Sequence, residues 1–226
     1  RDGVECHPAD SIESVSLYHD GRDMRAIIAG TGPSLTPEVI ERVKASGLPV
    51  YGCNQTFELF DLDEFLACNI EWWRYYWPRS ERLRTMTCPK WTWDKATALE
   101  FDLDWIEGRW GDGLSTDNRY IHLAHSSGAQ ILGIAYHAGV REAILVGYDM
   151  QYGAGYDGRK QQLGNARHYF GEYPQELQHW TKNVGPNGEL TGLIDWYRTV
   201  AAQGAMRVTL GTPGSALAGI FAEDLI

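Results

Sequence analysis

An apolar run that ends in a glycine-rich turn constrains the fold of this chain more than any other feature of its sequence. Residues 25–29 (Arg-Ala-Ile-Ile-Ala) lead into the turn 30–34 (Gly-Thr-Gly-Pro-Ser), and a helical pattern follows over residues 37–46. An apolar run, a turn rich in Gly and Pro, and a helix predict a strand–loop–helix unit. Residues 48–54 predict a second strand, which completes a right-handed β-α-β unit.

A second unit of the same kind lies in the later half of the chain. Small polar residues at 126–128 can start a helix over residues 129–138, and the apolar run 143–146 has the composition of a buried parallel strand. Further patterns predict a strand at 64–68, a helix at 191–202, a strand at 206–210, and a loop at 211–215 before a terminal helix.

These units predict an α/β fold: a Rossmann-like, open, mostly parallel sheet with helices on both faces. A length of 226 residues fits a single domain, residues 1–226. Seven of the nine tryptophans fall between residues 72 and 110 with little clean periodicity. We therefore expect a Trp-rich insertion or lid within the domain, over residues 72–118.

Composition and charge narrow the classes of partner. The hydrophobic content of 43% is enough for a core, and the formal net charge of −10 disfavours indiscriminate binding to nucleic acid or anionic membranes. No apolar run has the length of a membrane span, and the first ten residues lack the order of a signal peptide. We expect a soluble, cytoplasmic protein whose four cysteines are buried free thiols, without a zinc site.

Polar side chains gather at the predicted carboxyl ends of the strands, where open α/β sheets bind ligands. The glycine turn can approach a phosphate, and the amides that follow the second and third strands can hold a sugar or a base. For each residue alone, turn formation or capping explains the residue type as well. The predicted nucleotide- or donor-binding residues are Gly30, Thr31, Gly32, Ser34, Asn54, Gln55, Asn69, Ser126, Ser127, Asp149, Tyr152 and Tyr156.

Residues that can move protons follow the buried strand at 143–146. His168 and Glu172 lie in the segment 167–174, and an imidazole or carboxylate above a sheet can act as a general base. His122 and His125 have a spacing that suits zinc, but with no third ligand nearby in sequence we interpret them as structural.

Basic residues are interleaved with the tryptophans. The window 72–91 holds five Lys or Arg and one Glu. Such a pattern can stack on nucleotides, single strands or sugar rings, or form a solvated face over an aromatic core. We expect Trp72, Trp73 and Arg74 to bind the acceptor.

Several motifs, in order along the chain, resemble known families. The segments 29–35, 53–55, 126–128 and 147–149 together resemble bacterial sialyltransferases that use CMP-sialic acid, and the related pterin-pyrophosphokinase-like proteins. The segments 113–117, 147–151 and 168–174 look like the tailed-phage proteins known as "norphogenetic protein", a likeness that spans residues 22 to 220. The phage relatives bring no settled activity, and a phage origin would place the protein in the host cytoplasm.

The sialyltransferase resemblance implies a metal-independent transferase that passes a sugar from a CMP-like or other nucleotide donor to a hydroxyl. Thr31, Asn54, Asn69 and Ser126-Ser127 match donor-site positions, and Tyr152 and Tyr156 lie near tyrosines that hold the leaving phosphate. Glu172 takes the place of the family's catalytic histidine, and His168 matches a neighbouring histidine.

Two alternatives remain open at this point. The first is a Mg²⁺-dependent pyrophosphokinase-like enzyme, and the second is a non-catalytic nucleotide- or carbohydrate-binding phage protein. No other cofactor and no bound metal are expected. The acceptor, a glycan or modified nucleic acid, is left open, as is a homo-oligomer.

Overall fold

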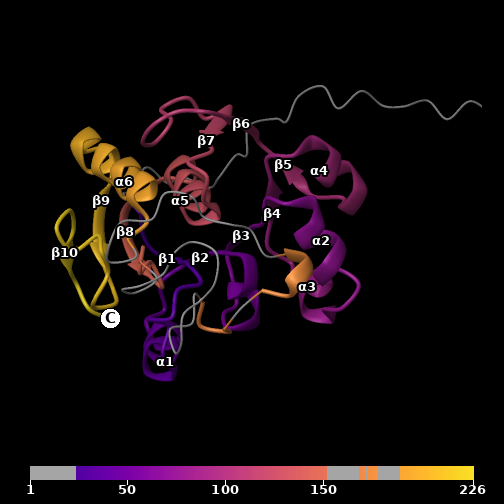
Figure 1. Ribbon diagram of the computed structural model, residues 1–226, viewed down its shortest axis with the longest axis horizontal. Helices are drawn as coiled ribbons and strands as arrows, with labels where there is room; N and C mark the ends of the chain where they lie inside the picture. Colours follow the sequence, from indigo (N-terminus) through magenta and orange to yellow (C-terminus); the bar gives the residue numbers. More distant parts are fainter. Residues whose placement is uncertain (1–23, 152–167, 172, 178–188) are drawn as a thin grey trace, which may run out of the picture.

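The computed structural model describes residues 24–151, 168–171, 173–177 and 189–226. Its main feature is an eight-stranded sheet with the order β10-β9-β8-β1-β2-β3-β4-β5, in which every neighbouring pair is parallel (Figure 1). The predicted α/β, Rossmann-like class is confirmed.

The strands of this sheet are β1 (Met24–Ala29), β2 (Val50–Cys53), β3 (Glu64–Leu66), β4 (Lys90–Thr92), β5 (Asp104–Trp105), β8 (Val140–Val146), β9 (Arg207–Leu210) and β10 (Ala222–Glu223). A second, two-stranded sheet pairs β6 (Glu107–Arg109) with β7 (Tyr120–His122). The helices are α1 (Pro37–Ala45), α2 (Ile70–Tyr76), α3 (Glu81–Thr85), α4 (Lys95–Phe101), α5 (Ser127–His137) and α6 (Thr191–Gln203), with 3-10 turns η1 (Asn54–Glu58) and η2 (Gln175–Leu177).

Helices cover both faces of the sheet, because the side chains of its central strand are apolar on each of the two faces. Ile27 and Ala29 of β1 pack in one cluster with Val39 and Val43 of α1, whereas Ala26 and Ile28 pack in another with residues of α5 and α6. Figure 1 shows α1 on one side of the strands and α5 with α6 on the other. These four residues of β1 are fully buried, as expected for a strand that is covered on both faces.

The order of the strands places a switch point beside β1. The chain adds β2 to β5 in one direction, then returns through α5 to place β8 on the other side of β1. In such sheets the loops after the two strands at the switch diverge and leave a crevice. The fold thus predicts a site between the loops that follow β1 and β8.

The Trp-rich region is built into the sheet. Its strands β4 and β5 extend the main sheet beyond β3, and α2 and α4 pack beside them (Figure 1). This region therefore supplies strands of the main sheet as well as helices that cover it. The insertion expected at residues 72–118 stays a prediction.

One sequence prediction is wrong. No helix follows residues 211–215; turns over residues 216–220 lead instead to the short strand β10. Backbone hydrogen bonds from the amides of Asp224 and Ile226 to Leu210 and Gly211 tie this end of the chain to β9. Pairing with the exposed edge of β9 satisfies these backbone groups without a helix.

Candidate functional site

A cavity of about 970 Å³ opens at the switch point. Its wall includes the turn after β1 (residues 30–32), the end of β2 (residues 53–54), the segment 124–128 at the start of α5, and residues 147–151 after β8. The volume suits a ligand of nucleotide size. The cavity therefore lies where the sheet topology predicts a ligand site.

Strained backbone is concentrated around this cavity. Of the five non-glycine residues with positive φ in the described ranges, four line it: Asn54, Ala124, His125 and Met150. Such conformations cost of order 1–3 kcal/mol each and tend to be found at functional sites. The concentration supports a role for the cavity beyond packing.

The glycine turn is shaped by contact with the loop after β8. A Cβ on Gly30 would lie 2.6 Å from the Gly147 carbonyl oxygen, and one on Gly32 would lie 1.9 Å from Oδ2 of Asp149. The Gly30 and Gly32 amides donate to the carbonyls of Val146 and Gly147, at 2.8 and 2.9 Å. These amides are therefore already engaged, and a phosphate-binding role for them would require them to change partner.

Asp149 is held against this turn. Ser34 Oγ donates to its Oδ2 at 2.9 Å and lies 3.1 Å from Thr212 Oγ1. Burial raises the pKa of Asp149, and the hydrogen bonds from Ser34 act in the opposite direction. Ser34 thus positions a cavity residue and is not itself part of the wall.

His168 is tied to the cavity wall through Thr31. Thr31 Oγ1 lies 2.9 Å from His168 Nδ1, and the Tyr169 amide donates to the Thr31 carbonyl at 2.9 Å. The imidazole stacks on Phe170 with ring centroids 4.9 Å apart and meets the edge of Tyr173 at 4.8 Å. The two aromatic contacts and the hydrogen bond with Thr31 help to fix the orientation of the ring.

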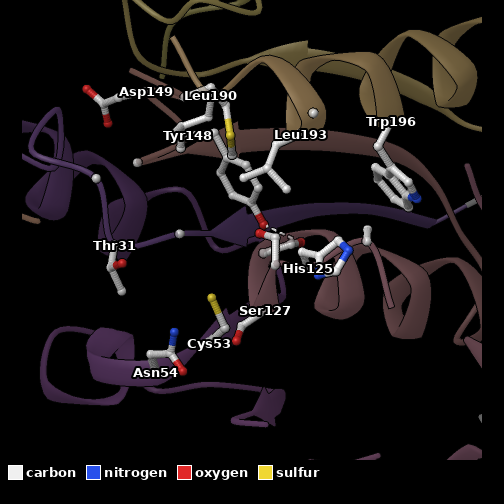
Figure 2. A pocket seen from close by; sticks show the side chains of 18 of the residues that line it. Thr31, Cys53, Asn54, His125, Ser127, Tyr148, Asp149, Leu190, Leu193 and Trp196 are labelled. Carbon is white, nitrogen blue, oxygen red and sulfur yellow. Dashed lines mark hydrogen bonds between the residues drawn. The ribbon is translucent and has the colours of Figure 1, made fainter. Parts of the chain in front are cut away.

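The start of α5 points into the cavity. Ser126 is the N-cap but makes no side-chain capping bond, and Ser127 and Gly128 line the wall beside it. Tyr148 donates to the Gly128 carbonyl at 2.8 Å and so joins this turn to the end of β8. Figure 2 shows Ser127 and Asn54 on one side of the cavity and Asp149 on another.

Eight of the predicted site residues line one cavity: Gly30, Thr31, Gly32, Asn54, Ser126, Ser127, Asp149 and His168. Gln55 is buried and Asn69 exposed, and neither forms part of the wall. Tyr152, Tyr156 and Glu172 lie outside the described residues.

The predicted acceptor residues lie apart from the cavity wall. Trp72 and Trp73 are buried, 4% and 0% exposed, in an aromatic cluster with Phe57 and Phe65. Arg74 donates twice to Glu100, at 2.9 and 2.7 Å. Their position gives the acceptor prediction no support, because buried indoles have no face to offer a ligand.

Several wall residues were not among the predicted site residues, and one of them, His125, had been interpreted as structural. Trp110, Asp112 and His125 line the mouth, and Leu190, Leu193 and Trp196 cover the cavity from the start of α6. His122 is structural, as expected: its Nδ1 lies 2.9 Å from the Gly113 carbonyl. For Trp110 a signal existed, since an indole before Gly111-Asp112-Gly113 lies in a turn and not on an apolar helix face.

Metal-binding and membrane features are absent from the described ranges. No three His, Cys, Asp or Glu side chains there are grouped as a metal site requires. None of the described helices combines the length and apolar character needed to cross a bilayer. Cys53 and Cys68 are buried free thiols, as predicted, and Cys88 is a half-buried one.

Comparison with known proteins gives structural neighbours only. The chain matches no protein-family model and no curated protein sequence. It is similar in structure to the sialyltransferase CstII from Campylobacter jejuni in complex with cytidine-5'-monophosphate: TM-score 0.51, 15% identity, over 90% of this chain and 86% of that one.

A structure of CST-II with trisaccharide acceptor and CMP gives a TM-score of 0.50 and 13% identity, over 88% of this chain and 85% of that chain. At these identities the likeness establishes the fold, which this chain shares with those sialyltransferases.

Proposed function

We propose that this protein is a glycosyltransferase that binds a CMP-like nucleotide-activated sugar and transfers the sugar to a hydroxyl acceptor. The observation that carries the proposal is the cavity at the switch point, where a helix start, hydroxyls, an amide and a fixed imidazole line one wall. The shared fold supports it, because the neighbours with this fold are sialyltransferases solved with CMP.

The start of α5 is the part of the wall best suited to a phosphate. The first amides of a helix have no intrahelical partners and carry partial positive charge. Ser126 makes no capping bond there, so its hydroxyl is not spent on that role. Ser127, Thr31 and Asn54 add side-chain donors around the same space.

The charge of the wall favours a donor with a single phosphate. Asp112 and Asp149 contribute carboxylates, and within the described ranges no Lys or Arg lines the cavity. The diphosphate of a nucleoside diphosphate sugar brings two negative charges that need compensation, whereas the phosphodiester that joins CMP to a sugar brings one. A CMP-like donor therefore fits this wall better than a nucleoside diphosphate sugar.

His168 is the general base in this proposal. In the tautomer that donates Nδ1–H to Thr31 Oγ1, Nε2 carries the lone pair that takes the acceptor proton. As that proton moves to Nε2, the acceptor oxygen bonds to the anomeric carbon. The bond from that carbon to the phosphate oxygen breaks, and the nucleotide leaves with the electron pair. Glu172 stays a predicted alternative base, and Tyr152 and Tyr156 stay predicted contacts to the leaving phosphate.

A thermal-shift screen tests donor binding. We expect CMP and CMP-sialic acid to raise the melting temperature without Mg²⁺, and UDP-, GDP- and dTDP-sugars to raise it less. A ligand at 100 times its dissociation constant adds about 2.7 kcal/mol. A shift that requires Mg²⁺ would favour the pyrophosphokinase-like alternative, and no shift with any compound would refute the proposal.

Release of CMP from CMP-sialic acid tests turnover. We expect His168→Gln to lower the rate about 10²- to 10⁴-fold while the CMP thermal shift remains. His137→Gln is the matched control, because His137 lies at the opposite end of α5 and bonds the Tyr120 carbonyl. Donor binding without turnover in the wild-type protein would support the non-catalytic alternative instead. The tailed-phage relationship stays a prediction beside these tests.

A further inference from the structure

Trp110 is more exposed than the other tryptophans in the described ranges. Its side chain is 67% exposed, whereas Trp72, Trp73, Trp91 and Trp196 are all below 5%. Two other large hydrophobic side chains in the described ranges are strongly exposed, Leu99 and Leu225, and neither lines the cavity. An exposed indole at a cavity mouth is costly to keep in water and is typical of a binding surface.

The loop that carries Trp110 is held in place. The Leu123 amide donates to the Arg109 carbonyl at 3.0 Å, and a Cβ on Gly111 would lie 2.5 Å from Nε2 of His122. Further along, Gln203 of α6 bonds both the amide and the carbonyl of Leu114, at 2.8 and 3.0 Å. The exposure of Trp110 is therefore imposed by its surroundings, and its ring face is presented in a fixed position.

A second ring extends this surface. The imidazole of His125 lies 4.4 Å from the Trp110 ring, centroid to centroid, at an angle of 39°. Ala124 and His125 both have positive φ, so strained backbone holds the imidazole at this place. The two rings form a pre-organised platform at the mouth.

A buried donor without a partner lies in the same wall. Trp196 is 4% exposed and lines the cavity, and its Nε1–H has no hydrogen-bond partner in the described part of the chain. Figure 2 draws Trp196 and His125 on one side of the cavity, away from Thr31 and Asn54. A buried N–H without a partner is unfavourable, and a hydrogen bond to a ligand oxygen would remove that penalty.

We propose that Trp110, His125 and Trp196 form a subsite for a pyranose ring. The aliphatic C–H face of a pyranose packs on an indole face, while its hydroxyl oxygens can accept from Trp196 Nε1 and its hydroxyl protons can reach the exposed carboxylate of Asp112. That carboxylate and the absence of Lys or Arg from the described wall disfavour a polyanion such as nucleic acid.

The open position also favours a sugar over a nucleobase. A ring on Trp110 keeps one side in solvent, which suits a sugar with hydroxyls around its rim, whereas a nucleobase gains most from burial of both faces. Whether the pyranose belongs to the acceptor or to the donor rests on the proposed function. The subsite itself does not depend on it.

Saturation-transfer NMR on the full chain tests the subsite. The probes are the methyl glycosides of galactose, glucose, N-acetylglucosamine and mannose at millimolar concentration, with and without CMP. We expect at least one glycoside to bind, and Trp110→Ala and Trp196→Phe to weaken it about tenfold or more. Trp110→Phe keeps a ring face and retains most of the binding. Leu99→Ala is the control for Trp110, because Leu99 is an exposed apolar residue outside the cavity. Trp72→Phe is the control for Trp196, because Trp72 has an unpartnered indole N–H outside the cavity. We expect both variants to bind the glycoside as the wild type does.

Thermal shifts with CMP and CMP-sialic acid identify the source of the sugar. If the pyranose is the acceptor, Trp110→Ala leaves both shifts unchanged; if it is the donor sugar, only the CMP-sialic acid shift falls. A loss of CMP binding itself in Trp110→Ala would overturn the subsite in favour of a nucleobase platform. The subsite would also be overturned if no glycoside bound, with or without CMP, or if a thymidine oligonucleotide bound more tightly than any glycoside. Neither of these two results would contradict the proposed function, which is tested by donor binding and turnover.

Discussion

The aromatic cluster around α2 and the rim of the cavity use the same residue types in opposite ways. In the cluster, Trp72, Trp73 and Phe65 meet each other at centroid distances of 5.2 to 5.8 Å, and the neighbouring arginines are bonded within the protein. At the rim, Trp110 shows a ring face to solvent and Trp196 keeps an unpaired N–H, within the described ranges. An unpaired indole N–H occurs in both regions, at Trp72 and at Trp196. The exposed ring face beside the cavity is therefore what distinguishes the site from the core.

The difference follows from the local backbone. Trp72 and Trp73 lie on a helix whose apolar face packs beside β3, so both rings are buried among other aromatic side chains. Trp110 follows a short edge strand and precedes a glycine pressed against His122. There is no helix face to bury it. One region therefore contributes stability, and the other has retained groups that a ligand can complete.

The largest expected effect is on the cluster. Trp73→Ala removes a fully buried indole and its bond to the Ala67 carbonyl, so we expect a loss of about 3–5 kcal/mol in the free energy of unfolding. Trp110→Ala should change it by less than about 0.5 kcal/mol, as an exposed side chain does. Urea unfolding of both variants measures this, and equal losses would remove the distinction between the two regions.

The next effect is the pH dependence of stability, through Glu64 of β3. Burial raises the pKa of Glu64 to about 7, while the hydrogen bond from Trp91 Nε1–H lowers it. The carboxyl of the unfolded chain has an ordinary pKa of about 4.5, so the stability contributed by the neutral carboxyl is full below pH 4.5 and is lost as pH rises through 7.

Replacing that carboxyl isolates its contribution. We expect Glu64→Gln to match the wild type at pH 5 and to exceed it by up to about 3 kcal/mol at pH 8 in urea unfolding. Glu41→Gln on the exposed face of α1 is the control and should show no such dependence. A Glu64→Gln difference that is the same at both pH values would contradict the assignment.

Thr31→Val tests how the cavity fixes its base. Loss of the hydrogen bond to His168 Nδ1 removes support for the imidazolium, so we expect turnover to fall about 10- to 100-fold and the midpoint of the pH–rate profile to move to lower pH. The CMP thermal shift should persist in Thr31→Val. The control is Thr85→Val, which should keep full activity because the Thr85 hydroxyl bonds within its own helix. Lost CMP binding with an unmoved pH profile would assign Thr31 to the nucleotide instead.

The smallest effect should come from Arg74→Ala. Its ion pair with Glu100 is exposed, and solvent screens the attraction, so the pair contributes little to stability. Because Arg74 lies outside the cavity wall, glycoside binding and CMP release should equal those of the wild type. A substantial loss of glycoside binding would return the acceptor site to the aromatic cluster.

Short-range patterns predicted most of the fold. The strand–loop–helix at residues 24–45 and the helix–strand at 127–146 follow from runs of apolar residues and from Gly, Pro and Ser at their ends. The edge strand β10 could not be predicted, because it depends on pairing with β9 and not on the composition of Ala222 and Glu223.

The site could be predicted only in part. Thr31, Asn54, Ser127 and Asp149 follow strands or begin a helix, so sheet topology alone brings them to one cavity. Trp110, His125 and Trp196 come from a loop, a strained turn and a distant helix, and only tertiary packing joins them. The concentration of tryptophans along the sequence instead indicated Trp72 and Trp73, which are buried in the folded chain.

Amide hydrogen exchange with and without CMP tests most directly the claim that the cavity at the switch point is a nucleotide site. Binding there predicts slower exchange in residues 30–32, 53–54, 125–128 and 147–151, which line the wall, and no change in residues 70–77 of the aromatic cluster. Unchanged exchange around the wall at saturating CMP, or protection confined to residues 70–77, would contradict the account.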